Sequence, residues 1–190
     1  KVNIIPNFIE TKKKTNSSEE KNYFLYAGRI SKEKGLYELI KSFNKLNPKG
    51  MSLKIVGNGP SLDFLKNKFV NKQNIEFLGT LENNQVLEIM NKAKAVITVT
   101  KLYEGQPTLL CEASSLGIPS IFPDTGGIKE FFPKSCKLKF EQFNYEDLDK
   151  KLKLCLDEEV STAEGANNKK FISKILNEDF ILEKFKKTFV

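Results

Sequence analysis

The sequence predicts an α/β domain, a Rossmann-like, doubly wound parallel sheet of about six strands flanked by helices. Short apolar runs alternate along the chain with stretches in which apolar residues recur at helical spacing. The turns between them are short, which is typical of right-handed β-α-β units in a parallel sheet that is covered on both faces. An open sheet is favoured over a closed barrel, because a barrel of this kind needs about eight strands.

Six apolar runs are the predicted strands. The first, YFLYAG, reads as a buried strand, and AVITVT is rich in β-branched residues. In chain order the predicted strands are Tyr23–Gly28, Ser52–Gly57, Asn74–Gly79, Ala95–Thr100, Ile118–Phe122 and, as an edge strand, Lys137–Phe140.

Helices are predicted between these strands. Gly35–Leu46 places its apolar side chains on one stripe, and Pro48 and Gly50 stop it. Pro107 suits the first position of a helix that runs to Leu116. The other predicted helices are Ser61–Val70, a stretch marked by Val86, Ile89, Met90 and Ala93, a short one after Gly126-Gly127, and two or three from Asn144 onward.

The composition excludes several kinds of site. The chain has no histidine, which excludes Ser-His and Cys-His catalytic pairs, a histidine base and His-ligated zinc. Its three cysteines are far apart and form no Cys-x-x-Cys pair, so we expect no thiolate metal site, no disulfide scaffold and a reducing, cytoplasmic compartment. No stretch approaches the roughly 20 apolar residues that span a bilayer.

The net charge of +7 suits polyanions, anionic lipid surfaces or ligands that carry phosphate. The lysines are scattered, however, and the loops lack interleaved aromatic residues, so a nucleic-acid-binding domain is the least favoured alternative. We expect no nucleic acid among the partners.

Ligands of such sheets bind beyond the carboxyl ends of the strands, so the loops after the strands hold the candidate site. The first loop, Gly28 to Gly35, carries Arg29 and Lys34 just before a helix start. Arginine binds phosphate oxygens in pairs, lysine adds a point charge, and a helix N-terminus attracts anions. The alternative is that both are solvated basic residues in a turn.

The second loop, Gly57-Asn58-Gly59-Pro60, begins like a dinucleotide-binding fingerprint, but Leu62 stands at the third glycine position. We interpret it as a tight turn whose glycines let a ligand or another loop approach the backbone.

The loop after the fourth predicted strand is the most informative. Glu104 lies just past the strand, and Gly105 permits close approach to the backbone. Pro107 then opens a helix whose free amide groups, around Thr108 and Leu109, can point at an anion.

A second carboxylate, Glu112, follows about a turn and a half into that helix. Carboxylates on both sides of an anion-binding helix terminus would repel a bare phosphate. They suit a nucleotide sugar, which carries ribose on one side of its diphosphate and the transferred sugar on the other. The alternative is that Glu104 is a loop charge and Glu112 a surface or capping residue.

Several short motifs occur in an order that a known family shares. They are Ile5-Pro6-Asn7, Gly28-Arg29 with Lys34-Gly35, Gly57-Asn58-Gly59-Pro60, Phe77-Leu78-Gly79, Glu104-Gly105 with Glu112-Ala113, Gly117-Ile118-Pro119, and Gly126-Gly127 with Glu130. Through them the chain resembles the C-terminal, donor-binding half of retaining glycosyltransferases of the GT-B fold, family 4 type.

The resemblance implies transfer of a sugar from a nucleotide-diphosphate donor, a UDP or GDP sugar, to an acceptor. It implies retention of anomeric configuration and no cofactor or required metal. Arg29 and Lys34 resemble the pair that binds the diphosphate and neutralises the leaving nucleoside diphosphate, and Glu104 resembles the residue that faces the donor sugar. These three are the expected catalytic residues, since preorganised positive charge at a leaving phosphate is an effective catalytic device.

The resemblance also implies a set of donor-binding residues, which are Gly28, Leu81, Gly105, Gln106, Pro107, Thr108, Leu109 and Glu112. Glu112 resembles the ribose partner. The amides near Thr108 and Leu109 would hold the distal phosphate, and the chain near Leu81 would lie against the base.

Three positions depart from the family's pattern. The family usually has Asn-Gly where this chain has Asn7-Phe8, often a serine at Lys101, and commonly an aromatic residue at Gln106. Lys101 and Gln106 are expected close to the donor sugar or phosphate, so the identity of the sugar is left open.

The family's N-terminal domain, which carries the acceptor site and closes over the donor, has no counterpart in this sequence. We expect the chain, 1–190, to form one domain with a polar loop at 11–22 and C-terminal helices at 170–190 that pack on that missing domain. Alone it should bind nucleotide weakly and be largely inactive. A nucleotide-sugar-binding module without transfer activity is the alternative.

The resemblance further implies a saccharide or lipid-linked acceptor of the kind used in polysaccharide biosynthesis. It would be met at the cytoplasmic face of the membrane, and the basic surface is compatible with a peripheral contact with anionic lipid. The Lys-, Asn-, Ile- and Phe-rich composition suggests an AT-rich, bacterial genome.

Overall fold

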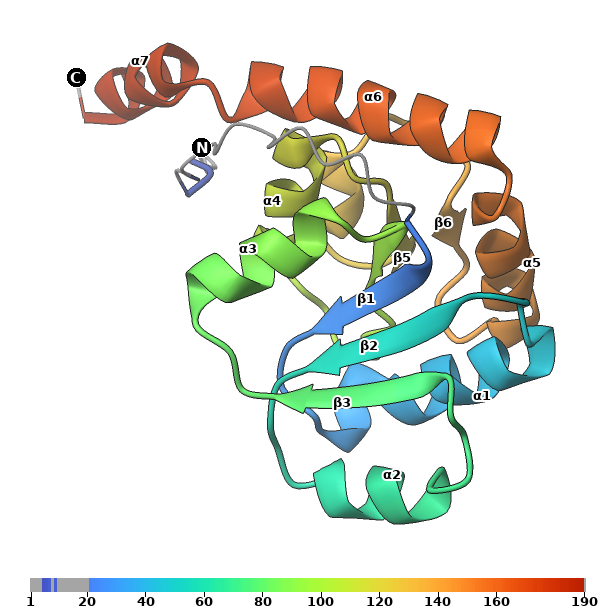
Figure 1. The fold of residues 1–190 in the computed structure, drawn as a ribbon. Helices are drawn as coiled ribbons and strands as arrows, with labels where there is room; N and C mark the ends of the chain where they lie inside the picture. The colour runs from blue at the N-terminus through green and yellow to red at the C-terminus, as the bar shows by residue number, and fades with distance from the viewer. Residues whose placement is uncertain (1–4, 8, 10–20, 190) are drawn as a thin grey trace.

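The fold is built on six parallel strands in one sheet (Figure 1). The computed structural model describes residues 5–7, 9 and 21–189, and the strand order is β3-β2-β1-β4-β5-β6. The strands are β1 Tyr23–Ala27, β2 Ser52–Val56, β3 Ile75–Gly79, β4 Ala95–Ile97, β5 Ser120–Pro123 and β6 Lys139–Phe140. This is the order of a doubly wound, Rossmann-like sheet, so the predicted fold class is confirmed.

Helices cover both faces of this sheet, with α1 and α2 on one side and α3 and α4 on the other (Figure 1). The helices are α1 Leu36–Leu46, α2 Leu62–Lys68, α3 Asn83–Asn91, α4 Thr108–Leu116, α5 Tyr145–Cys155, α6 Glu158–Ile175 and α7 Glu178–Phe189. Two short 3-10 turns, η1 Lys32–Lys34 and η2 Ile128–Phe131, follow the ends of β1 and β5. Of these two turns the sequence predicted only the second.

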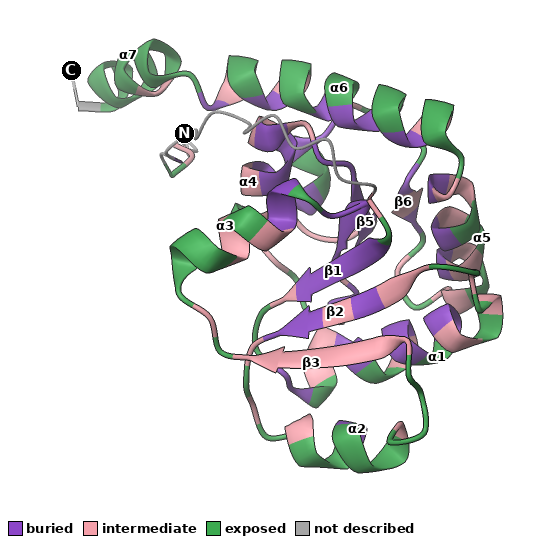
Figure 2. Ribbon diagram, viewed as in Figure 1, coloured by how far each residue is buried: buried purple, intermediate pink, exposed green. Residues whose placement is uncertain are grey.

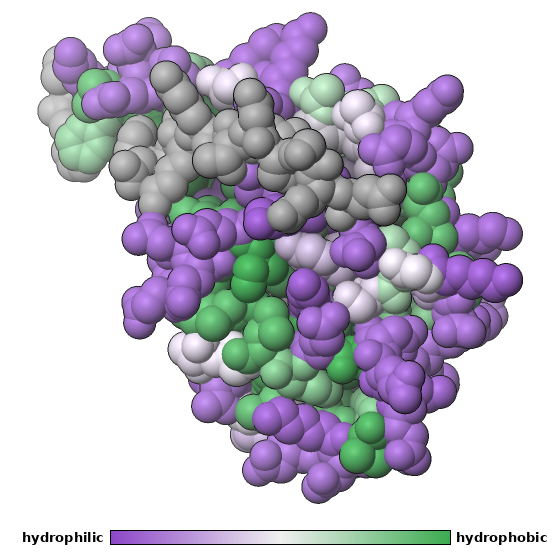
Figure 3. Space-filling model, in the orientation of Figure 1, coloured by the Kyte–Doolittle hydropathy of each residue, from purple (hydrophilic) through white to green (hydrophobic). Residues whose placement is uncertain are grey.

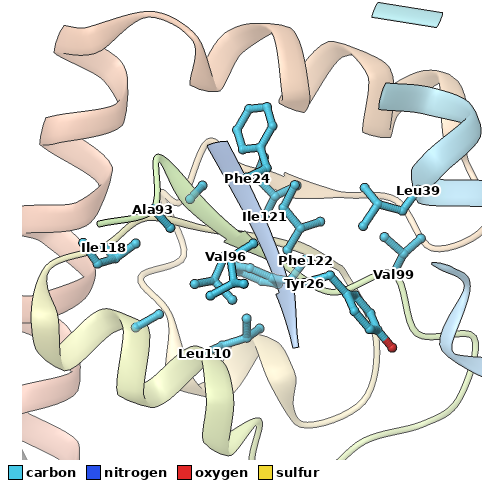
Figure 4. Packing of buried hydrophobic residues seen from close by; sticks show 14 of the residues in the cluster. Phe24, Tyr26, Leu39, Ala93, Val96, Val99, Leu110, Ile118, Ile121 and Phe122 are labelled. Carbon is cyan, nitrogen blue, oxygen red and sulfur yellow. The ribbon is translucent and has the colours of Figure 1, made fainter. Parts of the chain in front are cut away.

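The core lies between the central strands and the helices on each face. Successive side chains of β1 are buried on both faces, because this strand is flanked by β2 and β4 and covered from both sides (Figure 2). Phe24 and Ile121 lie within this packed interior (Figure 4). Phe24 also meets Phe43 of α1 edge to face, with ring centroids 6.2 Å apart.

Several predicted element ends differ from the structure, and two strand ends show a local reason. The strand predicted to reach Thr100 stops at Ile97, because the chain then crosses to the loop after β1, where Lys101 N donates to Glu33 O at 2.8 Å. The strand predicted from Ile118 begins at Ser120, because Ile118 N instead donates to Ala113 O at the end of α4.

Pro107 occupies the N-cap of α4 rather than its first turn, since its φ of −84° and ψ of 82° are not helical. The stop of α1 lies one residue before the predicted proline, because Asn47 adopts a left-handed conformation, with φ 42°, that ends the helix.

The surface is mixed in character. On the face shown in Figure 3, hydrophilic side chains surround a hydrophobic band. At the C-terminus, α7 extends from the end of α6 and leaves the apolar side chains of Phe180, Leu182 and Phe185 exposed (Figures 1 and 2). Among the described residues, no helix combines the length and the apolar content that a membrane crossing requires. Residues 11–20 of the predicted polar loop, and Val190, lie outside the described residues.

Candidate functional site

The candidate site lies at the carboxyl ends of β1 and β4, the two neighbouring strands from which the chain runs in opposite directions along the sheet. Such a switch point leaves a crevice between the two loops that follow the strands. A pocket of about 350 Å³ occupies this position. Its lining residues come from the end of β1, the loop after β4, the start of α4 and η2, and they are Tyr26, Ala27, Gly28, Arg29, Lys34, Thr98, Glu104, Gln106, Pro107, Thr108, Leu109, Leu110 and Ile128.

An ion pair joins the two loops across the pocket. Lys34 Nζ donates to Glu104 Oε1 at 2.5 Å, and about a quarter to a third of each side chain is exposed, 29% for Lys34 and 27% for Glu104. The two residues are 70 positions apart in sequence. The fold therefore brings a predicted phosphate-binding cation directly against a predicted sugar-binding carboxylate.

The loop that carries Glu104 is held from behind by the glycine turn before η2. Gly127 N donates to Glu104 O at 2.7 Å, and a Cβ on Gly127 would lie 3.1 Å from Gly105 O. The backbone of Glu104 is thus fixed by a segment that follows a different strand. From the sequence, this turn was predicted as the entrance to a helix and as part of the motif Gly126-Gly127 with Glu130.

The N-terminus of α4 opens into the same pocket. The first hydrogen bond of the helical i to i−4 type runs from Cys111 N to Pro107 O, at 2.9 Å. The amides of Leu109 and Leu110 precede it and so lie in the turn where helix amides have no intrahelical acceptor. Helix N-termini of this kind bind phosphates and carboxylates well.

The second loop packs against the first. Ile30 N donates to Asn58 O at 2.8 Å, and a Cβ on Gly57 would lie only 1.9 Å from Gly28 O. The interpretation of Gly57-Asn58-Gly59-Pro60 as a tight turn that lets another loop approach is confirmed, and the other loop is the one that carries Arg29.

Five lining residues were not predicted as site residues from the sequence, namely Tyr26, Ala27, Thr98, Leu110 and Ile128, and two of them stand out. Tyr26 lies near the end of β1, and its hydroxyl donates to Arg29 O at 2.8 Å. Burial, with smaller contributions from Glu104 and Glu33, raises the pKa of Tyr26, so its hydroxyl stays protonated and keeps this bond. Thr98, just beyond β4, lines the opposite side. Both sit at a strand's carboxyl end, and that position is the signal by which they could have been found.

Two of the side chains that depart from the family's pattern form hydrogen bonds in the structure. Lys101 was expected close to the donor, but its Nζ donates to Glu38 Oε1 of α1 at 2.6 Å, and it does not line the pocket. Gln106 does line the pocket, and its side-chain amide exchanges two hydrogen bonds with the backbone of Asn7.

Three of the predicted donor-binding residues lie outside the pocket wall. Glu112 is half-buried on α4, where its carbonyl accepts a hydrogen bond from Ser115 Oγ at 2.8 Å. Leu81 follows β3 and packs against the core, and Gly105 faces open space. The pocket therefore gathers Gly28, Arg29, Lys34, Glu104, Gln106, Pro107, Thr108 and Leu109, and these three are not among its lining residues.

Within the described part of the chain, no group of three or more His, Cys, Asp and Glu side chains is arranged to hold a metal ion. The three cysteines are buried, and burial raises the pKa of each thiol to about 12, so none of them is a ready nucleophile.

Comparison with known proteins identifies the family. Residues 7–172 match the family described as glycosyl transferases group 1. The chain belongs to this family.

The curated relatives of this family member are longer proteins. TuaC of Bacillus subtilis, whose name assigns it to teichuronic acid biosynthesis as a glycosyltransferase, is 31% identical over 127 residues, which are 66% of this chain and 30% of TuaC. The glycogen synthase of Mycobacterium tuberculosis is 29% identical over 112 residues, 56% of this chain and 27% of that protein. The chain thus spans about a third or less of the length of these relatives.

Solved structures show the same fold. TarM superposes with a TM-score of 0.85 at 21% identity, covering 97% of this chain and 38% of TarM. HepE from Anabaena, solved in complex with UDP and glucose, superposes with a TM-score of 0.77 at 16% identity, covering 90% of this chain and 48% of HepE. Both similarities show the fold, and this chain covers less than half of each of these proteins.

Proposed function

We propose that this chain is the donor-binding half of a retaining, metal-independent glycosyltransferase and that its pocket binds a nucleotide-diphosphate sugar. The observation that carries the proposal is the convergence of Lys34, Glu104 and the N-terminus of α4 on one pocket at the switch point of the sheet. Positive charge, helix amides and a carboxylate are the three kinds of group that a sugar diphosphate needs around it.

In this proposal the diphosphate lies between the loop after β1 and the start of α4. Arg29 and Lys34 neutralise the charge that grows on the leaving phosphate as the glycosidic bond breaks. The amides of Leu109 and Leu110 hold the distal phosphate, because the Thr108 amide already donates to Gln106 O. The ammonium of Lys34 moves from Glu104 to a phosphate oxygen. The carboxylate of Glu104 is then free to accept hydrogen bonds from the hydroxyls of the sugar.

The nucleoside end of the donor extends beyond the pocket. Glu112 lies on α4 four residues after Thr108, about one turn farther along the helix, which is a suitable position for a partner of the ribose hydroxyls. Leu81, at the end of β3 on the far side of the switch point, is the proposed neighbour of the base. Three solved structures that superpose on this chain contain UDP, which makes UDP the first nucleotide to test.

The other half of the enzyme would come from a separate part of the full protein. It would carry the saccharide or lipid-linked acceptor and close over the donor, with the exposed apolar side chains of α7 packed against it. The chain by itself should therefore bind the nucleotide and transfer little sugar. We place the reaction in the cytoplasm, with the acceptor presented at the membrane surface.

The proposal is tested by adding UDP, GDP and ADP in turn to the isotope-labelled chain, without metal, and following its backbone amide resonances. NMR detects millimolar binding, so the weak affinity expected without the second half is no obstacle. One nucleotide is expected to shift the amides of Gly28, Arg29, Thr108 and Leu109 more than any others. Shifts centred instead on the hollow of about 430 Å³ between α1 and α2, around Tyr37 and Phe64, would contradict the proposal, as would the absence of binding by all three nucleotides.

A further inference from the structure

The side chain of Gln106 joins two parts of the chain that are 99 residues apart. Asn7 N donates to Gln106 Oε1 at 2.6 Å, and Gln106 Nε2 donates to Asn7 O at 2.9 Å. These two bonds define the orientation of the Gln106 side-chain amide. A flipped amide would place its NH2 group against the N–H of Asn7 and its oxygen against the carbonyl oxygen of Asn7. The Gln106 side chain therefore pairs with the backbone N–H and C=O of Asn7, as the backbone of a neighbouring strand would.

A second contact holds the chain just after this point. Ile9 is 5% exposed, belongs to the hydrophobic core and lines a groove of about 380 Å³ together with Cys111 and Ser115 of α4. The N-terminal segment, Ile5–Asn7, is thus attached at the start of α4, and the chain is held again alongside the middle of the same helix.

Gln106 also belongs to the candidate site. Gln106 is part of the pocket wall, and it directly precedes Pro107, the N-cap of α4. Its carbonyl accepts a hydrogen bond from Thr108 N at 3.1 Å. A displacement of Gln106 would therefore displace the helix terminus that is proposed to hold a phosphate.

The contact includes one position, Gln106, at which the chain departs from its family's pattern. Gln106 stands where an aromatic residue is common, and Asn7 is followed by Phe8 where glycine is usual. An aromatic hydrocarbon ring could neither accept from Asn7 N nor donate to Asn7 O. The hydrogen-bonded link is consequently a property of this chain's own residues.

We propose that Gln106 is a positioning residue that couples the N-terminal segment Ile5–Asn7 to the occupancy of the pocket. A ligand that fixes the start of α4 stabilises the hydrogen bonds between Gln106 and Asn7. Because such coupling is reciprocal, a segment held by these bonds increases the affinity for the ligand by the same factor. In the full protein this segment would transmit the state of the pocket to whatever part of the chain precedes it. The inference rests on the proposed function, because the ligand in question is the nucleotide.

The test uses three variants and two measurements. Gln106→Met keeps the length of the side chain and removes both hydrogen bonds, while Gln73→Met makes the same change at an exposed glutamine before β3 and is the control. Asn7→Pro removes the donor from the other side of the contact. The measurements are hydrogen exchange at the Asn7 amide by NMR, with and without UDP, and the dissociation constant of UDP by calorimetry.

Loss of a bond of this kind is expected to speed Asn7 exchange on the order of fivefold in Gln106→Met, and Gln73→Met should leave it unchanged. UDP should slow Asn7 exchange in the wild-type chain and not in Gln106→Met. Gln106→Met and Asn7→Pro should each weaken UDP binding severalfold, and the double variant should be no weaker than either alone, because both remove one interaction.

Two results would overturn the coupling alone. One is UDP affinity that Gln106→Met leaves unchanged, and the other is a double variant whose loss equals the sum of the two single losses. A wild-type chain that binds none of UDP, GDP and ADP contradicts the proposed function itself, and the coupling fails with it. The two failures are therefore distinguishable.

Discussion

At the scale of single residues, the position of Lys34 depends on the glycine that follows it. Gly35 ends η1 and caps α1 with φ of 69°, and its Cα faces the backbone beyond β4, where a Cβ would lie 2.1 Å from Val99 O. Only a residue without a Cβ lets the loop after β1 approach β4 so closely. This approach is what allows the Lys34 ammonium to reach Glu104 across the switch point.

Gly35→Ala should therefore be much more destabilising than the same change at Gly50. The two glycines have nearly the same backbone conformation, with φ of 69° and 71°, so the strain of a left-handed alanine is equal in both variants. Among the described atoms, a Cβ on Gly50 would meet nothing within 4 Å. We expect Gly35→Ala to lose about 1 to 3 kcal/mol more than Gly50→Ala in the free energy of urea unfolding. Equal losses would mean that the contact with Val99 relaxes without cost.

The residue scale is also where the sequence was least informative. Arg29, Lys34 and Glu104 were found because their residue types and their places after strands carry a chemical meaning. The partners of Lys101 and Gln106 were not, because the contacts are with Glu38 and Asn7, which are 63 and 99 residues away. Which polar group a long side chain reaches is decided by the packing of loops that a single sequence does not specify.

At the scale of secondary structure elements, the start of α6 is attached to the sheet by a buried lysine. Lys94, whose side chain is 5% exposed, precedes β4, and its ammonium donates to Glu158 in the first turn of α6. The hydrogen bond from Lys94, together with its charge, lowers the pKa of Glu158 from its ordinary value of 4.5, although burial acts in the opposite direction. A carboxylate whose pKa is lowered by folding stabilises the fold above its unfolded pKa, and this stabilisation is lost as the pH falls through the folded pKa.

Glu158→Gln is therefore expected to lower the Tm by a few degrees at pH 7, because Lys94 stays buried with a neutral acceptor in place of a charged one. Glu158 is 75% exposed, so solvent screening keeps the effect modest. The difference in Tm between wild type and variant should shrink once the pH falls below 4.5. Glu183→Gln, which removes the exposed pair with Lys187 on α7, is the control and should change little at either pH. A difference that persists unchanged at low pH would show that the ion pair is not its cause.

The elements themselves were predicted well, and their ends less well. The central strands are buried on both faces, so their sequences are continuous apolar runs that only a covered sheet accommodates. The end of β4 is followed by a backbone hydrogen bond to another loop, from Lys101 N to Glu33 O, and the start of β5 is preceded by one from Ile118 N to Ala113 O of α4. Such bonds leave no periodic signal in the sequence.

At the scale of the whole molecule, the strand order determines where the chemistry can occur. Because β1 and β4 are neighbours and the chain leaves them in opposite directions, their two loops form one pocket from residues that are widely separated in sequence. The alternation of elements in the sequence predicted a doubly wound parallel sheet, and the structure supplies the order of its strands. Three apolar side chains of α7 are exposed, and the chain spans about a third or less of the length of its curated relatives.

The most direct test of the central claim compares two lysines. Lys34 and Lys101 lie in neighbouring loops, are 29% and 24% exposed, and each is paired with a glutamate, at 2.5 and 2.6 Å. Only Lys34 lines the pocket. The measurement is the dissociation constant of UDP, by calorimetry at physiological salt, for wild type, Lys34→Met and Lys101→Met. At that salt a charge outside the pocket is largely screened.

If the pocket holds the diphosphate, Lys34→Met weakens UDP binding about tenfold or more, because it removes a charge-assisted hydrogen bond, while Lys101→Met changes it less than about twofold. Glu104→Gln should leave UDP binding equal or tighter, since it releases Lys34 from its carboxylate partner. Equal losses in the two lysine variants, or no loss in Lys34→Met, would contradict the assignment of this pocket as the donor site.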